Sequence, residues 1–308
     1  MQDHYRVKNN MAISVDIIIP TYRPDADFEK LLGMLGVQSV KPGKIIIINT
    51  DESEWNRYCG DEICANAGGG LTEVHHISKA EFNHGHARNL GAGYSSADYF
   101  VCMTQDAVPV DESLIENLLN AMGDSVKMSY ARQTAKSNAR DIEKITRSFN
   151  YPAESVTKSI ADIDRLGIKT FFASNVCCAY EKAKFDELGG FVDETDFNED
   201  MMYGSKLVRA GYAIRYCADA VVRHSHNYTA NQQYRRNYQV AVSQTEHPEY
   251  FSDVRSESEG IKLVKTTAGE LVHMGKWYLV PELIFISGVK YLGYRAGRRE
   301  GKKNITNE

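Results

Sequence analysis

The sequence lacks several features that would assign it to a specialised class of protein. Its 308 residues include only six cysteines and no Cys-x-x-Cys pair, so neither a disulfide scaffold nor a cysteine-based zinc site is indicated. Three of the cysteines lie inside apolar runs, as expected of buried, reduced thiols. The formal net charge is −5, and without a basic excess nucleic acid is not expected as a partner.

Long hydrophobic runs are also missing. No run approaches the ~18 to 20 apolar residues that span a bilayer. The first ten residues are polar and contain no apolar core, which does not fit a signal peptide. These absences predict a cytoplasmic protein whose residues 1–13 form a polar tail.

What the sequence does contain, after this tail, is an alternation of apolar strands and helices. Residues 15–20 form an apolar run that proline ends, residues 28–37 carry apolar side chains at helical spacing, and residues 44–48 form a second apolar run. Such β-α-β units make parallel sheets with right-handed crossovers. A helix rich in small residues over 85–94, which should pack close to the sheet, and a strand over 99–103 follow. The pattern predicts an α/β protein with a mostly parallel central sheet and helices on both faces.

The rest of the chain is less regular. Residues 53–72 are a polar, glycine-rich connection without a clear assignment. Residues 131–151 are polar with scattered Arg and Lys, and they either lie over a ligand or form a solvated surface segment. The other segments predicted as strands are 74–77, 126–130, 171–180, 214–217 and 220–224, and those predicted as helices are 112–122, 181–188, 201–210, 234–243 and 261–278.

One carboxylate stands out by its place in this pattern. Asp106 follows the predicted strand 99–103 at its carboxyl end. In an open α/β sheet that edge is where ligands bind, so Asp106 is a candidate for holding a metal or a phosphate-bearing ligand, and a helix cap or turn residue is the alternative.

Five short motifs, in order along the chain, resemble the inverting family 2 glycosyltransferases of GT-A fold, and within them the bacterial rhamnosyltransferases. The motifs are Ile-Ile-Pro-Thr-Tyr at 18–22, Phe-Asn-His-Gly-x-x-Arg-Asn at 82–89, Thr-Gln-Asp-Ala-Val-Pro at 104–109, Asn-Glu-Asp at 198–200 and His-Ser-His at 224–226. The resemblance implies a nucleotide-sugar-binding half, an acceptor-binding and catalytic half of the same domain, and a helical C-terminal extension. These parts correspond to residues 14–110, 111–230 and 231–308.

The resemblance also implies a divalent cation, Mg²⁺ or Mn²⁺, that neutralises the departing nucleoside diphosphate. The last Asp of the family's Asp-x-Asp motif, which meets the metal, corresponds to Asp106. His224 stands where the family often supplies a metal-binding imidazole, and His226 is a second candidate; a structural or exposed role is the alternative for both. Thr104 replaces the first Asp, which commonly contacts the ribose hydroxyls. Its replacement favours a deoxyribose, and therefore dTDP-rhamnose as donor.

The catalytic base implied by the resemblance is Asp200, with Glu199 in support. In an inverting transfer such a carboxylate takes the proton of the acceptor hydroxyl as its oxygen attacks the anomeric carbon. Because the pair precedes a predicted helix, a helix N-cap without chemistry is the alternative for Asp200.

Further contacts are expected from residues that match the family's donor and acceptor segments. Arg88 suits a diphosphate because its fork matches phosphate oxygens, and a salt bridge is the alternative. Asn49 stands where an Asp is more usual. The expected donor contacts are Thr21, Tyr22, Asn49, Asp51, His84, Arg88, Asn89, Gln105 and Asp106, and the expected acceptor contacts are Ser174 and Asn175.

The end of the chain is basic. Residues 290–303 carry six basic side chains and one acid, and apolar residues at helical spacing precede them. Such a segment fits a helix lying on an anionic membrane surface, or a helix packed on the core or on a second subunit of a homodimer.

The function that these features predict is metal-dependent, inverting transfer of a sugar, rhamnose above all, to a glycan or lipid-linked saccharide in bacterial polysaccharide synthesis. One alternative is a transferase of the same fold that uses a UDP-hexose or UDP-N-acetylhexosamine. Another is a nucleotide-sugar-binding scaffold without turnover.

Overall fold

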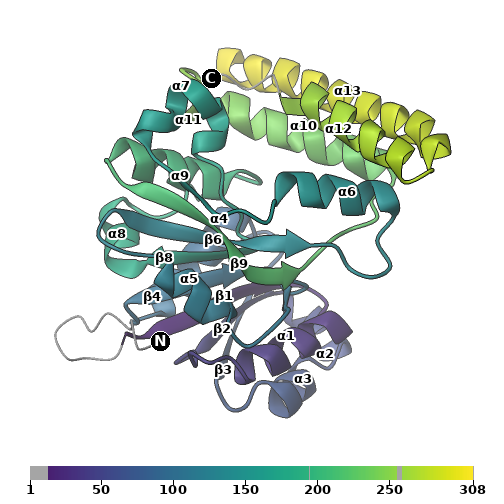
Figure 1. Cartoon of the computed structure of the whole chain (residues 1–308). Coiled ribbons are helices and arrows are strands. Elements are labelled where there is room, and N and C mark those ends of the chain that lie inside the picture. The colour runs from purple at the N-terminus through teal and green to yellow at the C-terminus, as the bar shows by residue number, and fades with distance from the viewer. Residues whose placement is uncertain (1–12, 194, 255–258, 308) are drawn as a thin grey trace, which may run out of the picture.

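The computed structural model describes residues 13–193, 195–254 and 259–307 (Figure 1). The predicted tail, residues 1–13, therefore lies almost entirely outside the described residues. The described residues form a nine-stranded mixed sheet at the centre of the fold. Its strand order is β3-β2-β1-β4-β8-β6-β9-β5, and β7 pairs with β9. The strands are β1 (Val15–Thr21), β2 (Ile45–Thr50), β3 (Thr72–Ile77), β4 (Tyr99–Met103), β5 (Val108–Pro109), β6 (Val126–Thr134), β7 (Val156–Lys158), β8 (Cys177–Glu181) and β9 (Ala213–Arg223).

Helices cover both faces of the sheet, as predicted. The α-helices are α1 (Ala26–Gly36), α2 (Glu52–Arg57), α3 (Gly60–Ala67), α4 (His84–Tyr94), α5 (Leu114–Asn120), α6 (Asp141–Asn150), α7 (Ile163–Leu166), α8 (Lys182–Glu187), α9 (Glu199–Arg209), α10 (Ala230–Glu246), α11 (Pro248–Phe251), α12 (Glu259–His273) and α13 (Val280–Asn307). Short 3₁₀ turns are η1 (Ile160–Asp162), η2 (Gly167–Thr170) and η3 (Trp277–Leu279).

The first half of the sheet is entirely parallel. Strands β3, β2, β1 and β4 pair in parallel, with Ile17 opposite Ile45 on one side and Val101 on the other. The second half adds antiparallel pairings, because β8 enters between β4 and β6 in the opposite direction and β5 and β7 run against β9. The parallel pairing predicted from the β-α-β unit is therefore found among β3, β2, β1 and β4, and again between β6 and β9.

The isoleucine-rich strands have a hydrophobic core on each face, because successive side chains of a strand point to opposite sides. Ile17 and Ile19 pack with α1 and α5, whereas Ile18 packs with the aromatic cluster near α8 and α9. All three are fully buried, and each stabilises the fold by about 1.5–3 kcal/mol relative to an exposed side chain. The prediction that small residues bring α4 close to the sheet is confirmed at Gly91, where a Cβ would lie 2.4 Å from Ile18 Cγ2.

Four of the less regular segments differ from the sequence-based expectation. Residues 53–72 contain α2 and α3, which pack around the fully buried Trp55. The predicted strand 171–180 begins only at Cys177, since residues 174–175 form hydrogen bonds with the side chains of Gln133 and Asp200 instead of with a strand. The two short strands predicted between 214 and 224 are the single strand β9. The segment 131–151 includes the end of β6 and helix α6.

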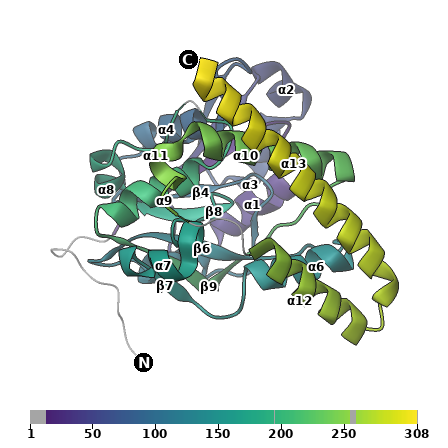
Figure 2. The same ribbon diagram turned by 90° about the horizontal axis from the view of Figure 1, so that it is seen from above.

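The last helices form a separate layer above the sheet. Helices α10 and α13 lie lengthwise against each other, and Figure 2, viewed from above, shows α13 as a long outer helix crossing the molecule. The close approach needs glycine, because a Cβ on Gly297 would lie 2.1 Å from the carbonyl oxygen of Tyr238. Within the described part of the chain, no helix has the length and apolar character that crossing a membrane requires.

Candidate active site

Three side chains from two strand ends converge at the edge of the sheet. Asp106 follows β4, and His224 and His226 follow β9. Strand β5 explains why they meet, because Val108 pairs with Arg223 and so brings the segment after β4 to the end of β9. The three residues, called the triad below, offer ligand atoms that all lie within 4.8 Å of one another.

The triad is packed closely. Nε2 of His224 lies 3.5 Å from Oδ1 of Asp106, and Nε2 of His226 lies 3.4 Å from Oδ2. The two Nε2 atoms are 3.1 Å apart. Two ligands at right angles, each about 2.1 Å from one ion, are about 3 Å apart, so these residues fit adjacent positions around a hard divalent cation. One carboxylate and two imidazoles are a donor set that suits Mn²⁺.

The hydrogen bonds around His224 fix which of its nitrogens is free. Oε1 of Gln133 accepts from Nη1 of Arg147 at 2.5 Å, and because a guanidinium only donates, the amide oxygen must face it. The same oxygen lies 3.1 Å from Nδ1 of His224, so Nδ1 carries a proton and donates. Burial lowers the pKa of His224 to about 3, which keeps the ring neutral. Its unprotonated Nε2 therefore points at Asp106 and His226, as a metal ligand requires.

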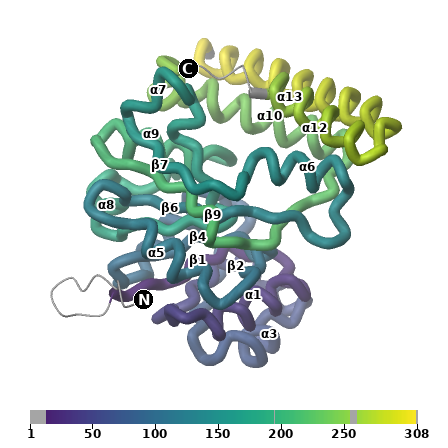
Figure 3. Tube along the Cα trace, viewed as in Figure 1, coloured from purple at the N-terminus to yellow at the C-terminus, as the bar shows by residue number. Residues whose placement is uncertain are grey.

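Asp106 is surrounded by groups that favour its charged form. Burial opposes ionisation, but the positive charges that His224 and His226 carry when protonated, together with the ammonium of Lys136, lower the pKa of Asp106. Nζ of Lys136 lies 3.3 Å from Asp106 and 2.9 Å from Asp27 on α1. The segment 131–151 thus brings at least two cations, Lys136 and Arg147, to the site. Figure 3 shows the neighbouring paths of β6 and β9 that carry this segment and the histidines to one edge.

A second pair of acids lies at the start of α9. Glu199 is buried and forms an ion pair with Arg88, with Nη1 and Oε1 3.3 Å apart. Although burial opposes its charge, Arg88, His84 and Asn175 lower the pKa of Glu199. Asp200 is only half-buried and so remains accessible from solvent. Burial together with the neighbouring Glu199 charge raises the pKa of Asp200 to about 7, which suits a group that accepts a proton near neutral pH.

Residues 174–175 connect the triad with the acid pair. The backbone N–H of Asn175 donates to Oδ2 of Asp200 at 3.1 Å, and its side-chain amide donates to Glu199 at 3.0 Å. The hydroxyl of Ser174 accepts from Nε2 of Gln133, whose oxygen holds His224. The predicted acceptor residues, which are neighbours in the chain, therefore join the two groups: Ser174 is linked to the triad through Gln133, and Asn175 holds both acids.

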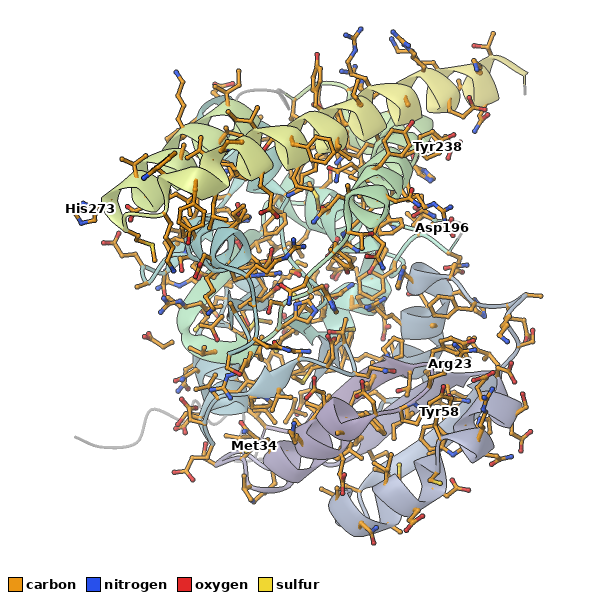
Figure 4. All side chains as sticks on the ribbon, turned by 90° about the vertical axis from the view of Figure 1, so that its right-hand side faces the viewer. Arg23, Met34, Tyr58, Asp196, Tyr238 and His273 are labelled. Atoms are coloured by element: carbon orange, nitrogen blue, oxygen red, sulfur yellow. The ribbon has the colours of Figure 1, made fainter. Side chains whose placement is uncertain are left out.

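The predicted donor residues after β1 and β4 are also brought together. The backbone N–H of Tyr22 donates to Oε1 of Gln105 at 2.8 Å. The Tyr22 ring is exposed and is flanked by two cations, Arg23 and Lys79, at 4.8 and 5.6 Å from its centroid. Arg23 in turn pairs with Glu54 of α2, and Figure 4 labels Arg23 and Tyr58 on this part of the molecule.

The residues after β2 differ in accessibility. Asp51 caps α2 through Ser53 and pairs with Lys79 at 2.7 Å, and Lys79 is the main cause of its lowered pKa. Asn49 is fully buried and its amide faces Nδ1 of His76, so the structure gives it no surface for a direct donor contact. Thr21 is buried too, and its hydroxyl donates to the carbonyl of Ile19.

The residues of α4 are held by internal partners. Arg88 is buried, forms an ion pair with Glu199 and donates to the carbonyl of His84. This is the salt bridge named above as the alternative to a diphosphate contact, and its acid is buried. His84 lies beside Arg88, and its pKa is lowered mainly by burial. Asn89 donates to the carbonyl of Phe191 and to Asp193, and accepts from the N–H of Phe191, so it fastens the loop before α9. In this arrangement, Arg88 and Asn89 position the acid pair.

Sequence reasoning missed several members of this site. Gln133, Arg147, Lys136 and Lys79 have no motif spacing that identifies them, and they reach the site only through tertiary packing. The one available signal was the cluster of basic residues in 131–151, which left a ligand-covering role open.

An α/β sheet with acids and imidazoles at its strand ends is an arrangement suited to binding a metal or a phosphate-bearing ligand, and the structure shares a GT-A-like fold with solved structures. A mannosyltransferase from Pyrobaculum calidifontis, solved with GDP-Man and Mn²⁺, matches with a TM-score of 0.57 and 13% identity over 95% of this chain and 78% of that chain. TarS 1–349 of S. aureus, solved with UDP-GlcNAc, matches with a TM-score of 0.52 and 11% identity over 95% and 92%.

The sequence comparisons specify the family. The model of glycosyl transferase family 2 matches residues 16–189. The O-antigen chain rhamnosyltransferase RfbN of Salmonella typhimurium is 32% identical over 93% of this chain and 90% of its own length. WbaN of Salmonella anatum, also an O-antigen chain rhamnosyltransferase, is 33% identical over 92% and 89%. The chain belongs to glycosyl transferase family 2 and is a glycosyltransferase.

Proposed function

We propose that this protein is an inverting, divalent-cation-dependent rhamnosyltransferase that moves L-rhamnose from dTDP-rhamnose to a glycan or lipid-linked saccharide acceptor. The observation that carries the proposal is the connection between the triad and Asp200: hydrogen bonds link His224 through Gln133 to Ser174, and the next residue in the chain, Asn175, donates to Asp200. The similarity over nearly the whole chain to two proteins named as O-antigen chain rhamnosyltransferases supports the choice of sugar.

The roles of the acids follow from their surroundings. Asp200 is accessible and has a pKa of about 7, so near neutral pH its carboxylate can take the proton of an acceptor hydroxyl as that oxygen attacks the anomeric carbon. Glu199 is held by Arg88 and Asn175; it keeps its charge and raises the proton affinity of its neighbour. Asn175 fixes the direction of the Asp200 carboxylate through its backbone N–H.

The leaving group departs on the other side of the site. Asp106, His224 and His226 would hold a divalent cation, which when bound supplies a Lewis acid for the diphosphate. Lys136 and Lys79 add positive charge near the same edge of the sheet. Tyr22 offers an exposed ring beside two cations, a surface suited to a base and its phosphates.

The deoxyribose preference is argued from Thr104. Its hydroxyl is buried and has no hydrogen-bond partner among the described residues, so it cannot replace the two acceptor oxygens of a carboxylate that would bind a ribose diol. A thymidine nucleotide lacks the 2′-hydroxyl and depends less on such a group.

The experiment is a donor and metal test on the whole protein. Calorimetry with dTDP and UDP, each with Mn²⁺ or Mg²⁺, is expected to give tighter binding of dTDP. Incubation with dTDP-rhamnose and a saccharide acceptor is expected to give a product of inverted anomeric configuration, seen by NMR, and EDTA is expected to abolish turnover. Tighter binding of UDP, a retained anomer or turnover that resists EDTA would overturn, respectively, the donor, the stereochemistry and the metal dependence.

A further inference from the structure

The C-terminal layer exposes large apolar side chains on one face. They lie in η3 and on α13, and they are between 59% and 68% exposed. Single exposed apolar residues are normal, whereas a neighbouring set of this size marks an interaction site. We call the set the apolar stripe, and it consists of Trp277, Tyr278, Ile284, Phe285, Tyr291 and Leu292.

The same face of α13 becomes basic toward its end. From Ile284 and Phe285 the exposed positions recur every three or four residues, which keeps them on one side of a helix. After Leu292 this side carries Arg295, Arg299 and Lys302, called the basic stripe, all of them exposed. Of the acids on α13, Glu282 pairs with Arg140 and Glu300 pairs with Lys303.

The opposite face of α13 is fixed against α10. A Cβ on Gly293, Gly297 or Gly301 would lie 2.4, 2.1 or 2.8 Å from the nearest atom of α10. Because a larger side chain has no room on that side, α13 cannot rotate to turn its apolar stripe inward. Figure 4 shows side chains projecting outward from α13, the long yellow helix that follows the labelled His273 at the end of α12.

We propose that this face of α13 docks on the surface of a bilayer that contains anionic phospholipid. A helix that lies in the interface buries apolar and aromatic side chains at the headgroup boundary while basic side chains meet the anionic headgroups. Trp277, Tyr278 and Tyr291 have the apolar rings and polar tips that suit this boundary.

The arrangement of charge favours a membrane over a second copy of the chain. A two-fold axis could relate two α13 helices in parallel, where the two basic stripes would face and repel each other, or in an antiparallel arrangement. Along the full helix, the antiparallel arrangement would lay the apolar stripe of one copy against the basic stripe of the other and would remove those charges from water. A membrane surface can contact both stripes of one helix at once, because it offers an apolar interior boundary and anionic headgroups side by side.

The test is binding of the whole protein to vesicles, with no donor or acceptor present, so its outcome is independent of the proposed function. Sedimentation is measured with vesicles of phosphatidylcholine alone and with vesicles of equal parts phosphatidylcholine and phosphatidylglycerol. The protein is expected to sediment with the anionic vesicles, and added salt is expected to weaken this binding.

Two variants separate the contributions of the stripes. Arg295→Glu with Arg299→Glu is expected to lower the partition coefficient at least about 25-fold, since each basic residue near an anionic surface contributes about 1 kcal/mol. Phe285→Ser with Leu292→Ser removes exposed apolar area and is expected to weaken binding by a similar factor. The controls are Lys41→Glu with Arg57→Glu, which makes the same change in net charge elsewhere, and Val37→Ser, which removes an exposed apolar side chain from the end of α1.

Three outcomes would overturn the proposal. Equal sedimentation with neutral and anionic vesicles, or unchanged binding of both stripe variants, would show that this face does not recognise an anionic surface. Absence of vesicle binding, with a dimer in light scattering that Phe285→Ser with Leu292→Ser converts to a monomer, would assign the face to a second copy of the chain. Circular dichroism of each variant checks that its helices are retained.

Discussion

Asp106 and Asp200 are aspartates of the same site with opposite surroundings. Asp106 lies among two imidazoles and an ammonium group, and its pKa is lowered. Asp200 lies beside an ionised carboxylate in a half-buried position, and its pKa is raised to about 7. Burial favours the neutral form of both, so the sign of the neighbouring charge decides the difference. In the proposed mechanism, this difference lets one side-chain type serve as a cation ligand in one place and as a base in another.

The largest effect on activity is expected from removing the proposed base, Asp200. Asp200→Asn keeps the size and the acceptor oxygen for Asn175 but cannot accept a proton, and turnover is expected to fall by about 10²- to 10⁴-fold. Steady-state kinetics with dTDP-rhamnose and acceptor measures the effect, with circular dichroism as the check of folding. Asp196→Asn, an exposed acid four residues earlier, is the matched control and is expected to keep its rate. A variant that folds and retains most of its turnover would remove Asp200 from the mechanism.

The next largest effect is expected on stability. Arg88→Met leaves the buried Glu199 without its cation, which costs about 3–5 kcal/mol for a buried pair, so the urea midpoint should fall strongly. Arg165→Met breaks the exposed pair with Asp162 and should cost at most about 1 kcal/mol. Equal losses in the two variants would contradict the role of Arg88 as the partner that keeps Glu199 charged.

A smaller effect is expected at the metal side. Gln133→Leu removes the acceptor that orients His224, and Mn²⁺ affinity is expected to fall by about 10- to 100-fold. Gln133→Glu restores an acceptor for Arg147 and His224 and is expected to retain affinity near that of the original protein. Calorimetry with Mn²⁺ in the absence of donor measures both. Equal Mn²⁺ affinities for the leucine variant and the original protein would show that His224 needs no such orientation.

The smallest effect is expected on the pH dependence of the reaction, which tests the raised pKa of Asp200 directly. Below its raised pKa of about 7 Asp200 is protonated and cannot act as a base, so kcat/KM for acceptor should rise about tenfold per pH unit up to about pH 7 and then level. Glu199→Gln removes the adjacent negative charge, and the midpoint is expected to move to lower pH while burial keeps it above the ordinary aspartate range. An unmoved midpoint would show that Glu199 does not set the proton affinity of Asp200.

Several features of the molecule could be read from the sequence because they depend on local pattern and residue chemistry. The apolar runs predicted the strands of the parallel half, the small residues of 85–94 predicted the close helix, and five ordered motifs identified the family that the comparisons show. Asp106, His224 and His226 could be named from their motifs, and the structure places them together.

Only the tertiary structure decided which of these residues touch. The partners of His224 and Asp106, Gln133 and Lys136, are 91 and 30 residues away along the chain. Arg88 and Asn89 turn toward the start of α9 and the loop before it, and Asn49 is buried beside His76 of β3, which no motif indicates. The physical reason is that strand register and helix packing bring distant segments together, and burial and hydrogen-bond partners, hence pKa values, exist only after that packing is complete.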